Sequence, residues 1–284
     1  MRILVTGGSG LIGRYVVRGL MEAGHQVTSV DLKPAVVFGV RSLLVDLTDA
    51  GQVYQALVRS QAEAVIHLGA WSGDGRVPDT RTYGDNVQGT FNVFQACADL
   101  GVRRVVLASS HHVYGVIKAP PVYVPIDEAH PLRPVNAYAL SKLACEQSAD
   151  YFVAQRGLEI LSFRFMGVRS PSQLAHEIEC ITKDPGRRIH LLWTRTDARD
   201  AALACRLAVE AQDVESGPYN ITGRLIVLEQ DSAELVRRYF GDQTEIRESL
   251  VGRLSPLSCA RAEKLLGYRP QYDWSVHQRY PEEA

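Results

Sequence analysis

A glycine-rich turn directly after the first apolar run is the feature that most constrains the fold of this chain. The apolar run is Ile3-Leu4-Val5, and the turn extends from Gly7 to Gly13. Two glycine patterns fit it, G-x-G-x-x-G from Gly8 and G-x-x-G-x-x-G from Gly7. A strand, a glycine turn and a helix start in this order let backbone amides approach a pyrophosphate. The sequence therefore predicts a dinucleotide-binding turn.

Short apolar segments alternate with segments of helical periodicity over the first 170 residues. The expected strands are residues 2–6, 26–30, 43–45, 64–68, 105–108 and 158–163, and the first expected helix covers residues 11–22. Such alternation is typical of a parallel sheet with helices on both faces. We therefore predict an α/β fold with a Rossmann-like, doubly wound parallel sheet, in which ligands bind at the carboxyl ends of the strands.

The pattern loosens after Pro171. Helices are expected over residues 174–182, 198–211, 229–240 and 260–266, and strands over 189–192 and 219–221. We predict a dinucleotide-binding domain over residues 1–170, to whose sheet later segments can return. Residues 171–284 are predicted to form a small, mixed α/β substrate-binding cap.

Composition narrows the classes of partner. The chain of 284 residues has a formal net charge of -1, which does not favour binding to nucleic acid. It lacks the apolar run of about 18 residues that a membrane span requires, and its N-terminus has no signal-peptide pattern. Five scattered cysteines without a C-x-x-C pair indicate reduced thiols. We expect a cytoplasmic protein without nucleic-acid or membrane partners.

Asp31 ends the second expected strand, 18 residues beyond Gly13. A carboxylate at this position accepts hydrogen bonds from the adenosine ribose hydroxyls and repels a 2′-phosphate. NAD is therefore the predicted cofactor, with Lys33 as a nearby cation that softens the discrimination against NADP. The alternative is that Asp31 only starts a turn before Pro34.

Tyr138 and Lys142 form a Y-x-x-x-K pair, and Ser110 follows the strand over residues 105–108. Residues four apart share one face of a helix, and a lysine cation favours the ionised form of a tyrosine. Such a tyrosine works as a general acid or base, while a serine at the strand end holds a substrate oxygen. The alternatives are a solvated helix face for the pair and a polar strand end or helix cap for the serine.

Several blocks together resemble the extended short-chain dehydrogenases/reductases, and more narrowly the NAD-dependent epimerase/dehydratase group. The blocks are Thr6 to Gly13, Asp46-Leu47, His67 to Ala70, Asn86 to Thr90, Ser109 to Gly115 and Tyr138 to Lys142. The resemblance implies Tyr138 as the general acid/base, Lys142 as its activator and ribose ligand, and Ser110 as the substrate-orienting hydroxyl. The cofactor-binding residues that it implies are Gly7, Gly10, Leu11, Ile12, Gly13, Asp31, Asp46, Leu47, Leu68, Gly69, Ala70, Asn86, Ala108, Tyr138, Lys142 and Phe165.

Departures from the family pattern concern the substrate. Gly167 stands where the family often has an asparagine that contacts a nucleotide-sugar phosphate, and the interval from Pro171 to Trp193 is short. Both departures favour a smaller substrate, such as a free sugar, a uronic acid or a hydroxy acid. The Ser-Ser-His-His stretch that ends at His112 is similar to the Ser-Ser-Asn-His of uronate dehydrogenases.

The predicted substrate contacts are Ser72, Ser110, His111 and Arg195. A guanidinium pairs with a carboxylate or a phosphate, although Arg195 is equally compatible with a solvated position or an ion pair to Asp197 or Asp200. His111 either bonds the substrate or packs against the following turn. No metal site is expected, because no ligand cluster has suitable spacing.

The leading hypothesis is an NAD-dependent oxidoreductase acting on a secondary hydroxyl of a sugar or sugar acid, with a uronate dehydrogenase favoured. An alternative is a UDP-hexose 4-epimerase that retains its NAD. A hypothesis of another class is a non-catalytic dinucleotide sensor, against which the Ser110, Tyr138 and Lys142 set argues. The family resemblance also implies a homodimer through two helices, over residues 83–100 and 137–155. The simpler alternative is that the apolar faces of these helices pack onto the sheet of the same chain.

Overall fold

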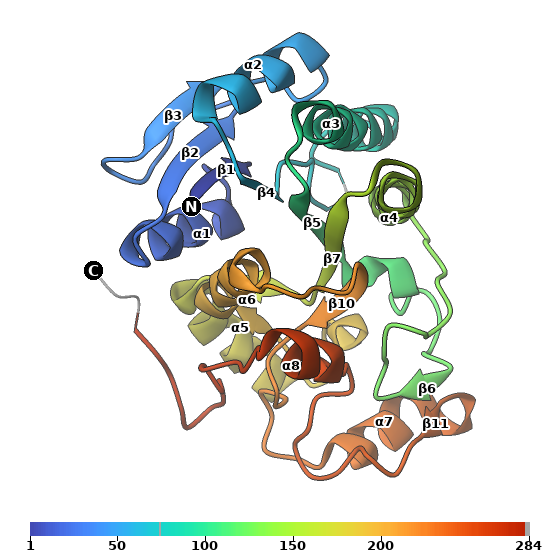
Figure 1. Cartoon of the computed structure of the whole chain (residues 1–284). Coiled ribbons are helices and arrows are strands. Elements are labelled where there is room, and N and C mark those ends of the chain that lie inside the picture. The colour runs from blue at the N-terminus through green and yellow to red at the C-terminus, as the bar shows by residue number, and fades with distance from the viewer. Residues whose placement is uncertain (74, 282–284) are drawn as a thin grey trace. The chain divides into compact units, whose positions relative to one another are not determined.

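A central seven-stranded sheet has the strand order β10-β7-β5-β4-β1-β2-β3 (Figure 1). The computed structural model describes residues 1–73 and 75–281. The strands are β1 (Arg2–Thr6), β2 (Gln26–Asp31), β3 (Arg41–Leu44), β4 (Ala64–His67), β5 (Arg104–Ser110), β7 (Glu159–Phe165) and β10 (Gly217–Ile221). β1 pairs in parallel with both β2 and β4. The predicted Rossmann-like parallel sheet is thus confirmed.

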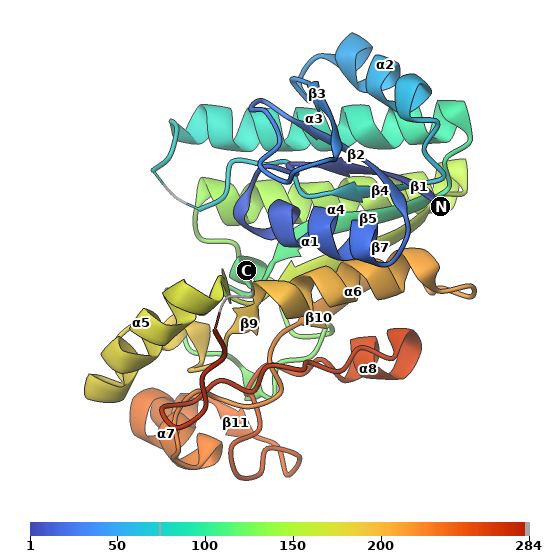
Figure 2. The same cartoon turned by 90° about the vertical axis from the view of Figure 1, so that its left-hand side faces the viewer.

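Helices cover both faces of this sheet, which explains why almost every residue of the inner strands β1, β4 and β5 is buried. The helices are α1 (Leu11–Glu22), α2 (Ala50–Ser60), α3 (Asp79–Leu100), α4 (Ala137–Arg156) and α6 (Ala198–Glu210). Figures 1 and 2 show α2, α3 and α4 on one face and α1 and α6 on the other. None of the helices in the described part of the chain combines the length and apolar character that crossing a membrane requires.

The strand order reverses at β1, which has β4 on one side and β2 on the other. In a doubly wound sheet the ligand crevice opens at this point, outside the carboxyl ends of the strands. Thr6, Asp31 and His67 are the last residues of β1, β2 and β4, and Ser110 is the last residue of β5. Parallel pairing therefore brings these four strand ends to one edge of the sheet. Asp31 and Ser110 among them are predicted site residues.

The chain divides into two compact units whose segments alternate along the sequence. The first unit comprises residues 1–110, 136–163 and 202–218, and the second comprises 111–135, 164–201 and 219–284. β10 thus brings a late segment to the edge of the central sheet, beside β7. The division at residue 170 stays a prediction.

The second unit contains two small parallel sheets and several helices. β6 (Tyr123–Val124) pairs with β11 (Glu245–Ile246), and β8 (Val168–Arg169) pairs with β9 (Thr196–Asp197). Its helices include α5 (Pro171–Lys183), α7 (Ser232–Phe240) and α8 (Ala260–Leu266). The mixed character predicted for the C-terminal region is observed in this unit.

The strand predicted over residues 189–192 is wrong. Ile189–Leu191 is a 3-10 helix, preceded by Arg188 and followed by Leu192 in the left-handed region. Leu191 and Leu192 are both buried, although neighbouring residues of a strand point to opposite faces. A tight turn buries both side chains at once, which a pattern of apolar residues alone does not reveal.

Candidate functional site

The glycine turn joins β1 to α1, and its backbone atoms lie very close to one another. Gly7 has φ +68, and the amide of Gly10 donates to its carbonyl oxygen over 3.0 Å. A Cβ at Gly13 would lie 2.1 Å from that same oxygen, so only glycine fits there. No side chain caps the start of α1, which leaves its first amides to an anion. The turn therefore has the form that a pyrophosphate requires, with Leu11 and Ile12 opening the helix.

Asp31 lies beside this turn at the end of β2. Its Oδ2 accepts a hydrogen bond from the amide of Ser9 over 3.1 Å, and its Oδ1 accepts one from the amide of Lys33 over 3.3 Å. The carboxylate is partly exposed. It is thus fixed next to the glycine turn with acceptor capacity that suits a ribose hydroxyl.

Asp46 and Leu47 form the turn between β3 and α2. Asp46 is exposed, and its Oδ1 accepts from the amide and the hydroxyl of Thr48. Leu47 packs so closely on Gly69 that a Cβ on this glycine would lie 2.5 Å from the leucine Cδ1. The structure therefore brings Leu47, one of the predicted cofactor-binding residues, to the segment Leu68 to Ala70.

The segment after β4 is held by two buried polar side chains. His67 is hydrogen-bonded to Thr6 over 2.7 Å and to Thr90 over 3.0 Å, and it connects β1 with α3. Burial lowers the pKa of His67 to about 3, with Lys142 contributing, so the ring is neutral at pH 7. Asn86 binds the backbone of Trp71 and also donates to the hydroxyl of Ser141 over 3.0 Å. His67 lies in one of the blocks that resemble the family, but the resemblance predicted no role for it.

Ser110, Tyr138 and Lys142 come together between β5 and α4, and each is less than one tenth exposed. The side chains of Ser110 and Tyr138 are hydrogen-bonded to each other. Lys142 Nζ donates to the carbonyl oxygen of Ala108 over 2.8 Å and lies 5.9 Å from the centroid of the Tyr138 ring. The three residues predicted to carry the chemistry thus form one cluster in the first unit.

The protonation of this cluster depends on burial. Burial raises the pKa of Tyr138, while the hydrogen bond from Ser110 and the charge of Arg76 lower it. The net shift of the Tyr138 pKa is upward, whereas Lys142 was expected to lower this pKa. Burial also lowers the pKa of Lys142, and Cys145 and Glu146 oppose that effect. Each group is therefore biased toward its neutral form by the surrounding protein.

In the second unit, His111 is buried and directed at the backbone. Its Nδ1 lies 3.1 Å from the carbonyl oxygen of Phe165. A carbonyl only accepts, so Nδ1 carries the proton and Nε2 is left as an acceptor. Burial lowers the pKa of His111 well below its usual value, and His112, in ring contact at 4.5 Å, adds to this.

Arg195 lies in the same unit and is paired with a carboxylate that sequence analysis did not consider. Its NH2 group contacts Glu177 Oε1 over 3.1 Å, in place of the ion pair to Asp197 or Asp200 that was one alternative. The side chain of Arg195 is 2% exposed, and its Nε has no hydrogen-bond partner in the described structure. Arg169 and Arg188 also contact Glu177.

Two further observations bear on the predicted site. Ser72 is exposed on the segment that follows β4. The residues that the structure describes contain no group of three or more histidine, cysteine or acidic side chains that could hold a metal ion.

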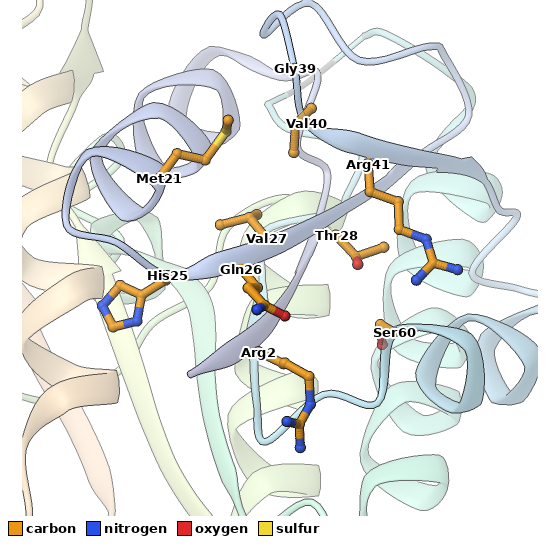
Figure 3. A pocket seen from close by; sticks show the side chains of 10 residues that line it. All are labelled: Arg2, Met21, His25, Gln26, Val27, Thr28, Gly39, Val40, Arg41 and Ser60. Atoms are coloured by element: carbon orange, nitrogen blue, oxygen red, sulfur yellow. The ribbon is translucent and has the colours of Figure 1, made fainter.

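A cavity of about 380 Å³ lies at the opposite edge of the sheet, around the first residues of β1, β2 and β3 (Figure 3). Arg2, Gln26, Arg41 and Ser60 line it, and none of the predicted site residues does. It therefore lies away from the carboxyl ends of the strands, where the dinucleotide crevice is predicted.

Known proteins share both the sequence pattern and the fold. A UDP-glucose 4-epimerase of Streptomyces lividans is 32% identical over 191 residues, covering 63% of this chain and 56% of that enzyme. A uronate dehydrogenase of Pseudomonas syringae pv. tomato is 31% identical over 166 residues, covering 57% of this chain and 58% of that enzyme. The match thus spans little more than half of either relative.

A crystal structure of a short-chain dehydrogenase/reductase superfamily protein from Agrobacterium tumefaciens with bound NAD has a TM-score of 0.74 and 25% identity. It covers 95% of this chain and 92% of its own. The family model described as the NAD dependent epimerase/dehydratase family matches residues 3–222. On this match and on the glycine turn, the strand-end serine and the tyrosine–lysine pair, the chain belongs to the NAD dependent epimerase/dehydratase family.

Proposed function

We propose that the protein is an NAD-dependent dehydrogenase that oxidises a secondary hydroxyl of a sugar acid of the uronate type. The observation that carries this proposal is the buried cluster of Ser110, Tyr138 and Lys142 at the carboxyl edge of a dinucleotide-binding sheet. Tyr138 removes the hydroxyl proton, and Ser110 orients the hydroxyl. Lys142 holds the cofactor ribose and supports the ionised form of Tyr138.

The cofactor-binding residues are proposed from the shape of the first unit. The turn from Gly7 to Gly13 holds the pyrophosphate, and Asp31 accepts from the adenosine ribose. Leu47 and the segment Leu68 to Ala70 line the remaining length of the cofactor. Bound NAD supplies the hydride acceptor for the reaction. Phe165, which belongs to the second unit, remains a predicted cofactor contact.

Recognition of a sugar acid is supported by the chemistry around Arg195. The buried Nε of Arg195 is a charged donor without a partner in the described structure, and a carboxylate is a suitable acceptor for it. A Cβ at Gly167 would lie 3.2 Å from Arg195 Cδ, so an asparagine there would crowd the arginine. His111 offers Nε2 as an acceptor for a sugar hydroxyl, and Ser72 is a further proposed contact.

A UDP-hexose 4-epimerase is the second candidate. The 32% identity to the Streptomyces lividans enzyme supports it. The same Ser110, Tyr138 and Lys142 set would serve this reaction, in which the hydride returns to the sugar. The two candidates differ in whether NADH is released.

Absorbance of NADH with a panel of uronates, aldoses and UDP-sugars separates these candidates. A dehydrogenase accumulates NADH in proportion to the sugar acid consumed, and Tyr138→Phe abolishes this signal while Tyr151→Phe, an exposed tyrosine on the same helix, keeps it. Interconversion of UDP-sugars without NADH accumulation would establish the epimerase instead. NADP in place of NAD tests the discrimination assigned to Asp31.

A homodimer through α3 and α4 is proposed on the exposure of their apolar side chains. Tyr83, Phe91, Leu140 and Tyr151 are between 39% and 52% exposed on these two helices. Light scattering after size exclusion is expected to give twice the mass of 31.4 kDa. Phe91→Glu is expected to give the monomer, while an unchanged mass would place the contact elsewhere.

A cytoplasmic location is proposed on the state of the thiols. All five cysteines are free, and four of them are buried. Free buried thiols are typical of a reducing compartment.

A further inference from the structure

Glu146 is a buried carboxylate next to the catalytic cluster. It lies on α4 and is 7% exposed. Its Oε1 accepts a hydrogen bond of 2.5 Å from the hydroxyl of Ser109, which is itself buried. Burial of a carboxylate is costly, so a role that requires the charge is the natural explanation for its presence here.

Three consecutive residues at the end of β5 are bound by three polar side chains of α4. Lys142 binds the carbonyl oxygen of Ala108, Glu146 binds the hydroxyl of Ser109, and Tyr138 binds the hydroxyl of Ser110. The three helix residues are spaced four apart, so they line one face of α4 over two turns. Glu146 thus belongs to the same row as the two proposed catalytic residues of this helix.

The titratable and polar groups that face Lys142 come from three elements. Cys145 and Glu146 lie on α4, His67 comes from β4, and the carbonyl oxygen of Ala108 comes from β5. Burial raises the pKa of Cys145, so this thiol is neutral at pH 7, and His67 is neutral as well. Glu146 is therefore the one carboxylate among these described neighbours of Lys142.

We propose that Glu146 is a positioning residue whose negative charge keeps the buried Lys142 in its ammonium form. The inference rests on the proposed roles of Lys142 and Tyr138. Burial favours the neutral amine, and a carboxylate one helical turn away opposes this. A charged Lys142 can donate to the cofactor ribose and stabilise ionised Tyr138, whereas a neutral amine does both less well.

Glu146→Gln separates the charge from the hydrogen bond. The glutamine Oε1 still accepts from Ser109, so this variant removes only the negative charge. Ser109→Ala removes the hydrogen bond and keeps the charge. Asp150→Asn is the matched control, because Asp150 is an exposed carboxylate one turn further along the same helix.

The measurement is the dissociation constant of NADH against pH, read from NADH fluorescence with protein freed of copurified dinucleotide. Wild type is expected to bind NADH more weakly at alkaline pH, as Lys142 loses its proton, and Lys142→Met is expected to remove this dependence. Glu146→Gln is expected to lower the pH midpoint of this loss of NADH affinity by about one pH unit. Ser109→Ala and Asp150→Asn are expected to leave its midpoint in place.

The proposal is overturned if the pH midpoint of Glu146→Gln stays at the wild-type value, or if Asp150→Asn shifts the midpoint equally. It is also overturned if Lys142→Met still loses affinity for NADH at alkaline pH. A merely structural role for Glu146 would weaken NADH binding at every pH without moving the midpoint. The assay needs no substrate. It therefore stands even if no sugar in the panel reduces NAD, a result that would defeat only the proposed function.

Discussion

The side-chain amide of Asn86 pairs with both backbone groups of Trp71: its Oδ1 accepts from the Trp71 amide over 2.8 Å, and its Nδ2 donates to the Trp71 carbonyl over 3.1 Å. The segment Leu68 to Ala70 therefore cannot move away from α3 without breaking two hydrogen bonds. This pairing ties the chain just after the segment Leu68 to Ala70, which is proposed to line the cofactor, to α3.

Asn86→Ala is expected to destabilise the protein by about 3 kcal/mol, because buried donors and acceptors lose their partner. The affinity for NADH is expected to fall at the same time, because the segment Leu68 to Ala70 is no longer held against α3. Urea unfolding and NADH fluorescence test the two effects. Gln95→Ala serves as the control, because its amide pairs with Asp99 on the surface of the same helix. Equal losses in the two variants would contradict the assignment.

Two glycine-to-alanine changes are expected to have opposite signs. At Gly13 the new methyl group would meet the carbonyl oxygen of Gly7 at 2.1 Å, which forces the turn apart and costs about 3 kcal/mol along with NADH binding. At Gly84, inside α3, a Cβ meets nothing within 4 Å. Gly84→Ala is expected to stabilise the protein by about 0.5–1 kcal/mol. Thermal unfolding with and without NADH measures both.

His67 is expected to make the protein acid-sensitive. Its pKa is about 3 in the folded protein, below the ordinary 6.5, so the unfolded chain takes up a proton first as the pH falls. Its contribution to stability is complete above about pH 6.5 and is lost toward pH 3, with about 2 kcal/mol gone near pH 5.

His67→Gln is expected to reduce the difference in unfolding free energy between about pH 7 and about pH 5 by roughly that amount. His277→Gln changes an exposed histidine and is expected to leave the difference unchanged. An identical pH dependence in all three proteins would show that His67 does not carry the effect.

Glu177 is expected to matter mainly through Arg195. Glu177→Leu leaves the buried guanidinium without its carboxylate and is expected to cost about 3–5 kcal/mol. The double variant with Arg195→Met is expected to recover at least about 2 kcal/mol relative to the sum of the single losses. Arg188→Met, at a half-exposed side chain, is expected to cost less than about 1 kcal/mol. Additive losses in the cycle would refute the coupling.

Local features of the chain were predicted well. The bounds of α1 match the prediction from periodicity and the flanking glycines, and α8 was predicted with the same bounds. The cluster of Ser110, Tyr138 and Lys142 could be foreseen because a strand end and one helical turn set its geometry. The cofactor-binding residues predicted around this cluster came from the family resemblance and not from strand or helix geometry.

Contacts between distant parts of the chain could not be foreseen. Arg195 was expected to pair, if at all, with acids close to it in sequence, whereas Glu177 lies 18 positions away. The bond between Glu146 and Ser109 spans 37 positions. The helical spacing from Lys142 to Glu146 was a usable signal, but periodicity does not reveal which face of a helix meets which strand.

The position of β10 has a consequence for how the protein is made. This strand ends at residue 221 of 284, yet it lies at the edge of the sheet that holds the glycine turn. Until that segment leaves the ribosome, β7 is an open strand edge, which is a template for pairing with other chains. The cofactor-binding sheet therefore stays incomplete until β10 has been made, and a pause in synthesis between β7 and β10 would expose an aggregation-prone intermediate.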